Sequence, residues 1–243
     1  MTALARSIAR EGSRFDDADD VRLAEELGAN GYAVLRQILD SKECAALRAL
    51  YADGKQFRSR VVMARHGFGQ GEYQYFAYPL PPLIGELRTA LYPRLAPIAN
   101  RWNELLKIET RYPGDLGEFL QSCHDAGQQR PTPLLLKYGE GDYNRLHRDL
   151  YGPTQFPLQA TILLSDPARD FTGGEFVLVE SAPRVQSRAE IVPLSLGDMV
   201  IFAVNARPVP ATRGVKRVAL RHGVARIRSG HRMTLGLIFH DAA

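Results

Sequence analysis

The pattern of apolar residues along the chain changes near residue 130. Before that point, segments with apolar residues at helical spacing alternate with short extended segments. The first helix is predicted from Asp17 to Leu27, where Gly28 and Gly31 end the pattern. The other elements predicted here are strands at Gly31–Leu35, Arg60–Ala64 and Glu72–Tyr78, a helix capped by Asp40 or Ser41, and helices at Leu83–Leu106 and Glu118–Cys123. This region is therefore expected to be mostly helical, with one hairpin.

After Pro133 the chain changes to short strands separated by turn residues. The predicted strands are Leu134–Tyr138, Arg145–Asp149, Leu158–Ser165, Glu175–Glu180, Ala189–Leu194, Met199–Val204, Arg217–Ile227 and Arg232–His240. Strands at this spacing indicate a β-sandwich or jelly roll, with the earlier helices packed outside one sheet, and hence an α+β fold. The segment from Arg207 to Gly214 contains two prolines and is expected to be a mobile loop.

The two regions are expected to form one globular unit, with residues 1–130 supporting a core formed by residues 131–243. At 243 residues the chain is long enough to bury a substantial core. No apolar run approaches the roughly 18 residues that a membrane helix needs, and the first ten residues lack the apolar segment of a secretory signal. Cys44 and Cys123 lie far apart and form no C-x-x-C pair. A reduced, cytoplasmic protein without disulfides or structural zinc is predicted.

The net charge of +4 is unevenly distributed. The segment from Met199 to His240 has no acidic residue, and its eight basic residues are Arg207, Arg213, Lys216, Arg217, Arg221, Arg226, Arg228 and Arg232. Subtracting these eight from the 31 basic residues leaves 23 against 27 acidic residues in the rest of the chain. Such segregation is typical either of a surface for an anionic partner or of a solvated basic strand pair.

Candidate metal ligands lie at two places in the predicted strands. Alternate side chains of a strand share one face, so His147 and Asp149 are expected to point inward while Arg148 points outward. By the same alternation His222 shares an apolar face with Val218, Leu220 and Val224, opposite Arg217 and Arg221. Two imidazoles and one carboxylate on one face of a metal leave the other face open, which is the arrangement of non-haem Fe(II) oxygenases.

Arg232 and Thr234 follow the second histidine, His222, by ten and twelve residues in the sequence. Arg232 and Thr234 share one face of the last predicted strand, whereas Met233, Leu235 and Leu237 are expected to face the core. H-x-D alone is weak evidence, because His147 could simply pair with Asp149 at the end of a strand. The combination of the dyad, His222 and the Arg-x-Thr pair is far more specific. An alternative ligand pair, His240 with Asp241, lies at the far end of the last strand.

The segment from Tyr138 to Asp241 resembles the Fe(II)/2-oxoglutarate dioxygenase superfamily, which has H-x-D, a distal histidine and a basic residue on the last strand. The ten-residue step from His222 to Arg232 resembles the prolyl-hydroxylase-like branch, as does the strand that begins at Tyr138 and leads into the dyad. Where those hydroxylases often have a second tyrosine, this chain has Thr161 and Leu163. The whole chain is similar to bacterial 2-oxoglutarate–Fe(II) oxygenases.

The resemblance implies a double-stranded β-helix core and an enzyme that uses Fe(II), 2-oxoglutarate and dioxygen, releasing succinate and CO₂. By this likeness His147, Asp149 and His222 would hold the iron. The far carboxylate of 2-oxoglutarate would pair with Arg232, with help from Thr234 and Tyr138. The function expected from the resemblance is hydroxylation of a substrate.

Three hypotheses for the substrate remain open. Hydroxylation or oxidative dealkylation of nucleic acid, in repair or modification, is favoured by the basic C-terminal segment, whose candidate anion-binding rim is Arg148, Arg217, Arg221, Arg226 and Arg228. Hydroxylation of a peptide or protein side chain is favoured by the likeness to prolyl hydroxylases. A non-catalytic binding module is the third. The aromatic run Tyr73, Tyr75, Phe76 and Tyr78 is interpreted as hairpin core, with stacking on a base or gripping of a proline ring as the alternative.

Overall fold

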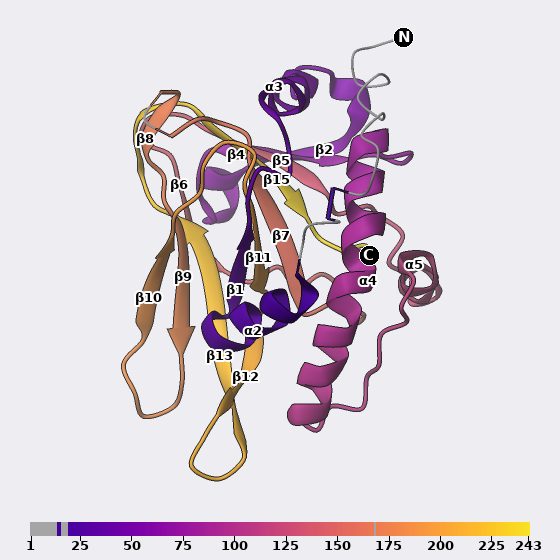
Figure 1. The fold of residues 1–243 in the computed structure, drawn as a ribbon. Coiled ribbons are helices and arrows are strands. Elements are labelled where there is room, and N and C mark those ends of the chain that lie inside the picture. The colour runs from indigo at the N-terminus through magenta and orange to yellow at the C-terminus, as the bar shows by residue number, and fades with distance from the viewer. Residues whose placement is uncertain (1–13, 16–18, 168) are drawn as a thin grey trace.

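The computed structural model describes residues 14–15, 19–167 and 169–243, and these form two antiparallel sheets flanked by helices (Figure 1). The larger sheet has the order β1 (Tyr32–Leu35), β11 (Met199–Ala203), β7 (Leu158–Leu163), β15 (Arg232–Leu237), β5 (Leu134–Tyr138), β4 (Glu72–Phe76) and β2 (Phe57–Val62). The smaller has the order β10 (Arg188–Val192), β9 (Phe176–Ser181), β13 (Val215–Val224), β6 (Tyr143–His147) and β3 (Gly69–Gln70). The predicted α+β fold with a jelly-roll core is confirmed.

The N-terminal region contributes strands as well as helices. β1 extends the larger sheet beside β11, β4 and β2 extend it beside β5, and β3 extends the smaller sheet beside β6. The helices are α2 (Asp20–Asn30), α3 (Ser41–Leu50), α4 (Pro82–Leu105) and α5 (Leu116–Asp125), with short 3-10 turns at Gly54–Gln56 and Met63–His66. None of the helices in the described residues combines the length and apolar content needed to cross a membrane.

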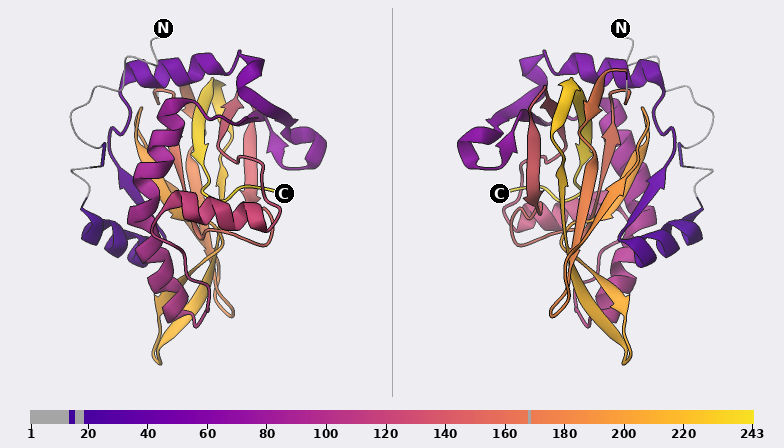
Figure 2. Two further views of the ribbon diagram at one scale, coloured as in Figure 1. Left: turned by 90° about the vertical axis from the view of Figure 1, so that its right-hand side faces the viewer. Right: turned by 90° about the vertical axis from the view of Figure 1, so that its left-hand side faces the viewer.

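The core lies between α4 and the outer face of the larger sheet (Figure 2). Leu87, Leu91 and Leu95 of α4 belong to the same fully buried cluster as Leu235 and Leu237 of β15. Because side chains alternate along β15, this leaves its other face to the space between the two sheets. One strand thus serves both the main core and the interior where the candidate site lies.

Capping residues explain where the first helices begin and end. The side chain of Asp19 accepts hydrogen bonds from the backbone at the start of α2, and Asp40 forms a capping box with Glu43 at the start of α3. The part of the first predicted helix at Asp17 lies outside the described residues. Gly28 does not end α2, which continues to Asn30. Gly31 ends it with a φ of +80°, and a Cβ there would lie 2.7 Å from the Leu220 side chain.

The first half of the segment expected to be a mobile loop is instead a strand, and residues 211–214 form the loop of its hairpin. β12 (Ala206–Pro210) pairs with β13, with Pro208 opposite Arg217. Its prolines are tolerated because β12 is an edge strand and needs no N–H on its outer side. Arg207 anchors it: the side chain is buried and donates hydrogen bonds to Glu180 (2.7 Å) and to the carbonyl oxygen of Gly28 (2.5 Å). For residues 207–210 the expectation was wrong, because proline was weighed more heavily than the strand pairing across the hairpin.

Two further short strands also escaped prediction. β8 (Phe171–Gly173) pairs with β14 (Ile227–Gly230) in a small sheet of their own, in which Gly173 and Gly230 have positive φ. Three- and four-residue strands do not show a clear alternation of apolar and polar residues. Cys44 and Cys123 are both buried and free, as the prediction of a disulfide-free protein required.

The alternative ligand pair, His240 and Asp241, lies in a buried polar network with residues of α4 and α5. The carboxylate of Asp241 accepts a hydrogen bond from the hydroxyl of Tyr78 (2.9 Å), contacts the Nε2 atom of His124 (3.0 Å) and lies 3.5 Å from the guanidinium of Arg88. Arg88 and Asp241 are 1% and 0% exposed. The Nδ1 atom of His240 accepts a hydrogen bond from the backbone N–H of Phe156.

Replacing Asp241 with alanine would leave the buried Arg88 guanidinium without its carboxylate. We expect Asp241→Ala to lower the free energy of unfolding by about 3–5 kcal/mol, the usual cost of breaking a buried ion pair from one side. Urea unfolding followed by circular dichroism measures this. Glu25→Ala, which removes an exposed carboxylate from α2, serves as the control and should change stability by no more than about 0.5 kcal/mol. A loss below about 1 kcal/mol for Asp241→Ala would contradict this account.

Candidate metal centre

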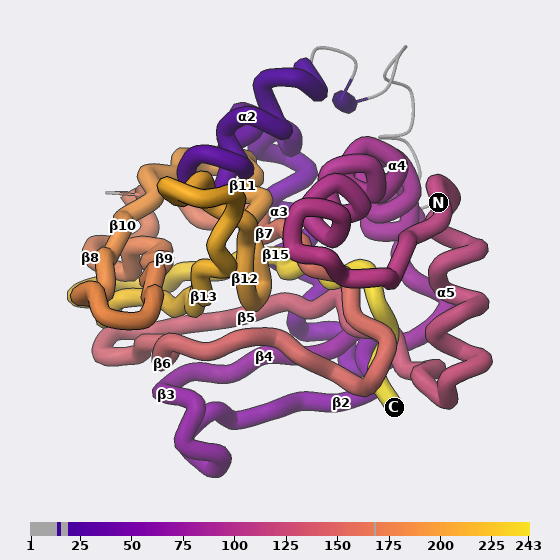
Figure 3. The backbone as a smooth tube through the Cα atoms, turned by 90° about the horizontal axis from the view of Figure 1, so that it is seen from below, coloured from indigo at the N-terminus to yellow at the C-terminus, as the bar shows by residue number. Residues whose placement is uncertain are grey.

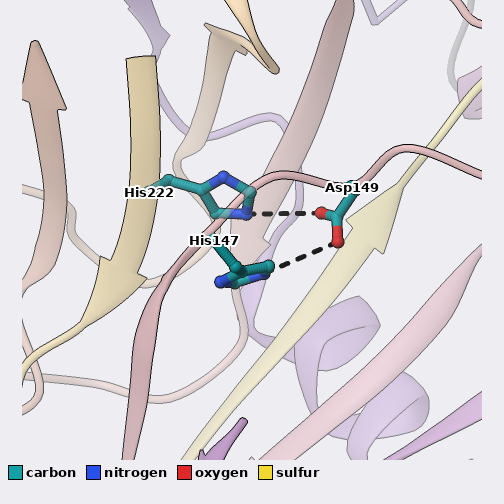
Figure 4. Close-up of side chains that lie close together, drawn as sticks. All are labelled: His147, Asp149 and His222. Carbon is teal, nitrogen blue, oxygen red and sulfur yellow. Dashed lines mark ion pairs between the residues drawn. The ribbon is translucent and has the colours of Figure 1, made fainter. Parts of the chain in front are cut away.

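Two neighbouring strands of the smaller sheet bring two histidines together. β6 and β13 are antiparallel, and His147 lies directly opposite His222 in their register. Their ring centroids are 4.2 Å apart, and Figure 4 shows both rings turned toward Asp149. His222 is largely buried and packs against Phe202 and Phe176, whose ring centroids lie 4.7 and 6.0 Å away. The alternation predicted along β13 is present, since Val218, Leu220 and Val224 are buried while Arg217 and Arg221 are exposed.

Asp149 completes the cluster from just beyond the end of β6. Its carboxylate oxygens lie 3.5 Å from Nε2 of His147 and 3.3 Å from Nε2 of His222 (Figure 4). Since β6 ends at His147, strand alternation does not place Asp149 as had been expected. Two side chains hold it instead: the Tyr151 hydroxyl donates to Oδ1 and Nε2 of Gln159 donates to Oδ2, both at 2.8 Å.

The ligand atoms of His147, Asp149 and His222 all lie within 4.8 Å of one another. Nδ1 of His147 lies 2.8 Å from the carbonyl oxygen of Arg145, which can only accept. Nδ1 therefore donates this hydrogen bond, and Nε2 is the ring atom that faces Asp149. Fixing one imidazole nitrogen to a backbone carbonyl is the usual way in which proteins orient a metal-binding histidine.

The electrostatics of the cluster favour an anionic carboxylate. Burial alone would raise the pKa of Asp149, but the hydrogen bonds from His147 and His222 outweigh it and hold the pKa well below its usual range. Burial also lowers the pKa of His222, and the neighbouring His147 lowers it further. For His147, burial is outweighed by the hydrogen bond with Asp149, and its pKa is raised. Two imidazoles and one carboxylate suit a divalent metal such as iron.

A cavity of about 200 Å³ opens beside the cluster and is lined by residues of both sheets. Arg232 and Thr234 of β15 and Tyr138 of β5 line it together with His147, Asp149 and His222. Arg232 lies directly opposite Tyr138 in the β15–β5 register, with its guanidinium 5.9 Å from the Tyr138 ring centroid. The structure thus brings all six predicted metal- and cosubstrate-binding residues to one cavity.

Arg232 is the least satisfied group in this cavity. Its side chain is 2% exposed, and within the described part of the chain Nε and Nη1 have no hydrogen-bond partner. Burial lowers its pKa to about 10. A buried guanidinium is costly unless an anion pairs with it. An incoming carboxylate, bound through two parallel hydrogen bonds, fits this position, so the residues present suit 2-oxoglutarate beside a metal.

The other cosubstrate candidates are also buried. Tyr138 is fully buried, and burial raises the pKa of its hydroxyl, which accepts a 3.4 Å hydrogen bond from Nδ2 of Asn144. Thr234 is 3% exposed. Thr161, at the position where related hydroxylases often have a tyrosine, donates its hydroxyl to the carbonyl oxygen of Leu235. Thr161 therefore holds neighbouring strands together at the wall of the cavity.

The five arginines of the predicted rim do not surround the cavity. All five are exposed, but Arg148 alone among them lines it, with Nε donating to the carbonyl oxygen of Leu220. Arg217 lines a separate hollow beside the end of α4. Arg226 lies 5.1 Å from the ring of Tyr143 and donates to the carbonyl oxygen of Gly141. The basic segment is therefore spread over several faces of the molecule.

Several residues at the cavity were not singled out by the sequence as site residues, among them Tyr151, Gln159, Phe68 and Tyr73. Tyr151 and Gln159 position Asp149, and Phe68 and Tyr73 line the cavity from the hairpin region. Tyr73 had been interpreted as hairpin core. Tyr151 could have been found from the sequence, because it lies two residues after Asp149. Gln159 and Phe68 could be found only from the pairing of strands in the structure. Tyr73 was ambiguous, because alternate faces of β4 serve the core and the cavity.

Comparisons with known proteins agree with this geometry. The fold is similar to that of a Pseudomonas putida prolyl-4-hydroxylase (TM-score 0.55, 14% identity, covering 93% of this chain and 100% of that one). It is equally similar to a 2OG-Fe(II) oxygenase family oxidoreductase from Burkholderia pseudomallei (TM-score 0.55, 16% identity, covering 96% of this chain and 95% of that one). At these identities the likeness shows the fold alone.

Comparisons of the sequence identify the family to which the chain belongs. Uncharacterized proteins from two strains of Mycobacterium tuberculosis are 52% identical over 168 residues, which cover 69% of this chain and 72% of theirs. Residues 71–242 match the model of the Oxygenase-NA family, described as "Oxygenase, catalysing oxidative methylation of damaged DNA". The chain therefore belongs to the Oxygenase-NA family of oxygenases, and its His147, Asp149 and His222 form a cluster that could hold a metal ion.

Proposed function

We propose that this oxygenase removes or modifies an alkyl group on a base of damaged nucleic acid, with iron held by His147, Asp149 and His222. In this proposal the far carboxylate of 2-oxoglutarate pairs with Arg232 and hydrogen-bonds to Thr234 and Tyr138. The observation that carries this assignment of the cosubstrate is the guanidinium of Arg232, which is buried and unpaired in the same cavity as the three candidate ligands. The two unpaired, buried cysteines also suit the cytoplasmic setting that we assign to it.

When bound, Fe(II) and 2-oxoglutarate together supply the activation of dioxygen, with release of succinate and CO₂. The residues of the chain position and shield this chemistry. Tyr151 and Gln159 hold the Asp149 carboxylate, while the Arg145 carbonyl holds the His147 ring. Arg232 would hold the far carboxylate of the cosubstrate in the same cavity as the three candidate metal ligands. Phe176 and Phe202 line the cavity and exclude water from it.

Nucleic acid is the substrate that we favour. An oxygenase that hydroxylates an N-methyl carbon yields a hydroxymethyl group, which leaves as formaldehyde and restores the unmethylated base. The family description names oxidative chemistry on damaged DNA. The aromatic residues Phe68, Tyr73 and Tyr151 line the cavity with the exposed Arg148, and such a mixture suits a base and its phosphate. Arg207 does not contribute, because its guanidinium is buried against Glu180.

The alternative substrate is a peptide or protein side chain. It is favoured by the ten-residue step from His222 to Arg232 and by aromatic residues that could also grip a proline ring. The peptide proposal provides no role for the exposed Arg148, which lines the cavity. A purely non-catalytic role is set aside, because the chain is a member of an oxygenase family and brings the three candidate ligands together.

Replacing Asp149 with alanine removes one candidate ligand, so we expect no measurable Mn(II) binding by calorimetry, with Mn(II) standing in for Fe(II), and no substrate-independent succinate formation. Tyr151→Phe keeps the ligand but loses one of its positioning hydrogen bonds, and should weaken Mn(II) binding by about 10- to 100-fold. Asp125→Ala, at an exposed position of α5, is the control and should bind like the wild type. Full turnover by Asp149→Ala would refute the ligand assignment.

Removing the charge of Arg232 tests the cosubstrate position separately. We expect Arg232→Met to raise the KM for 2-oxoglutarate by about 10- to 150-fold, since a hydrogen-bonded charged group contributes about 1.5–3 kcal/mol. Mn(II) affinity without 2-oxoglutarate should stay near that of the wild type. Arg101→Met, an exposed arginine of α4, is the matched control. An unchanged KM in Arg232→Met would mean that another group binds the far carboxylate.

The substrate class is tested by succinate release with panels of N-methylated DNA and RNA oligonucleotides, their unmethylated counterparts and proline-containing peptides. We expect methylated oligonucleotides to stimulate succinate release, with formaldehyde formed in equal amount. Unmethylated oligonucleotides control for nonspecific binding. Stimulation by peptides with incorporation of a hydroxyl group, and none by oligonucleotides, would replace nucleic acid by the peptide alternative.

A further inference from the structure

Phe68 is a large aromatic residue left exposed at the cavity. It lies in the segment 63–71, here called the Phe68 turn, which joins β2 to β4 and contains β3. Its side chain is 47% exposed and yet lines the cavity, so it stands at the opening. In Figure 3 this segment extends from β3 beyond β6 at the edge of the molecule. Isolated exposed apolar residues are common, so it is the position of Phe68 at the cavity that makes it a candidate contact for a substrate.

The backbone beneath Phe68 is held firmly although its ring is uncovered. The carbonyl oxygen of Phe68 accepts a hydrogen bond from the N–H of Arg145 (2.9 Å), and its own N–H donates to the carbonyl oxygen of Met63 (3.2 Å). Met63 is fully buried. Gly69 has a φ of +140°, and a Cβ there would lie 2.3 Å from the Tyr143 carbonyl oxygen. Only glycine permits this close approach of the turn to β6, which fixes the backbone from which the Phe68 side chain extends.

The surroundings of Phe68 are basic. From Lys55 to Gly71 the chain contains no acidic residue. Arg65 in the turn and Arg145 and Arg148 beside it are exposed, and none of the three lies within 4.0 Å of a carboxylate in the described part of the chain. The His66 ring stacks on Phe68 with centroids 5.3 Å apart. An aromatic platform flanked by unpaired arginines is the combination that single-stranded nucleic acid requires.

We propose that the Phe68 turn is a stacking platform for single-stranded nucleic acid, which extends the function proposed above. The nucleotide beside the target stacks on Phe68, and Arg65 and Arg145 bind the flanking phosphates. This leaves the neighbouring base free to enter the cavity. A duplex covers both faces of its bases, so the strand must be single or locally opened where Phe68 contacts it. A peptide without acidic residues would give Arg65 and Arg145 no anionic partner.

The proposal is tested by fluorescence anisotropy with labelled single-stranded oligonucleotides that carry 2-aminopurine next to an N-methylated base. We expect Phe68→Ala to weaken binding by about 5- to 150-fold, the range for loss of one base–aromatic stack. We expect the wild type to quench the fluorescence of 2-aminopurine by stacking, and Phe68→Ala should relieve this quenching. Phe68→Trp should restore both signals. Val185→Ala, an exposed apolar residue in the turn between β9 and β10, is the matched control and should bind as the wild type does.

The arginines are tested by the salt dependence of the same binding. Arg65→Gln should reduce the slope of log affinity against log salt concentration by about 0.7, the value for one phosphate contact on a single strand. Equal binding of duplex and single strand, or an unchanged affinity in Phe68→Ala that has the thermal stability of the wild type, would overturn the proposal. The proposal would also be overturned if the wild type bound a proline-containing peptide but no oligonucleotide, and if Phe68→Ala lost that peptide binding.

These outcomes are separate from failure of the proposed function. Oligonucleotides that bind in a Phe68-dependent way but never stimulate succinate release would refute the proposed reaction and leave the binding surface standing. Succinate release on methylated oligonucleotides with a KM unchanged by Phe68→Ala would support the reaction and refute the stacking platform.

Discussion

The register between β6 and β13 is the constraint on which the candidate site depends. His147 and His222 are opposite one another in this antiparallel pair, so their side chains emerge on the same face of the sheet. Because alternate residues face opposite sides, a slip by one residue would send His222 to the exposed face and Arg221 to the interior. The apolar neighbours of His222 prevent such a slip, since Val218, Leu220 and Val224 would have to leave the core with it.

Much of this arrangement could be predicted because strand alternation links distant residues through a simple rule. Eight strands, the inward face of β13 and the division of β15 into a core face and a cavity face all follow from a period of two. The same rule failed at Asp149, because β6 ends two residues earlier and hydrogen bonds from Tyr151 and Gln159 take over. Side-chain contacts between separate segments leave no periodic trace in a sequence.

Charge was the poorer guide to the surface. Counting arginines in the last fifth of the chain suggested one basic rim, but the fold separates them. Arg207 is buried in an ion pair, Arg217 lies near α4, and Arg232 lies inside the cavity. The arginines that do lie beside Phe68, namely Arg65 and Arg145, come from segments far apart in sequence and become neighbours through the pairing of β3 with β6. Only the strand order reveals such a cluster.

The two faces of β15 limit how this enzyme can change. Its outward side chains are part of the main core and its inward side chains line the cavity, so no position on that strand varies without affecting one or the other. The Phe68 turn is not constrained on two faces in this way. Most of its side chains are exposed, apart from the buried Met63 and Gly69. Substitutions in that turn are therefore expected to alter the opening of the cavity while the strands that carry His147, His222 and Arg232 keep their pairing.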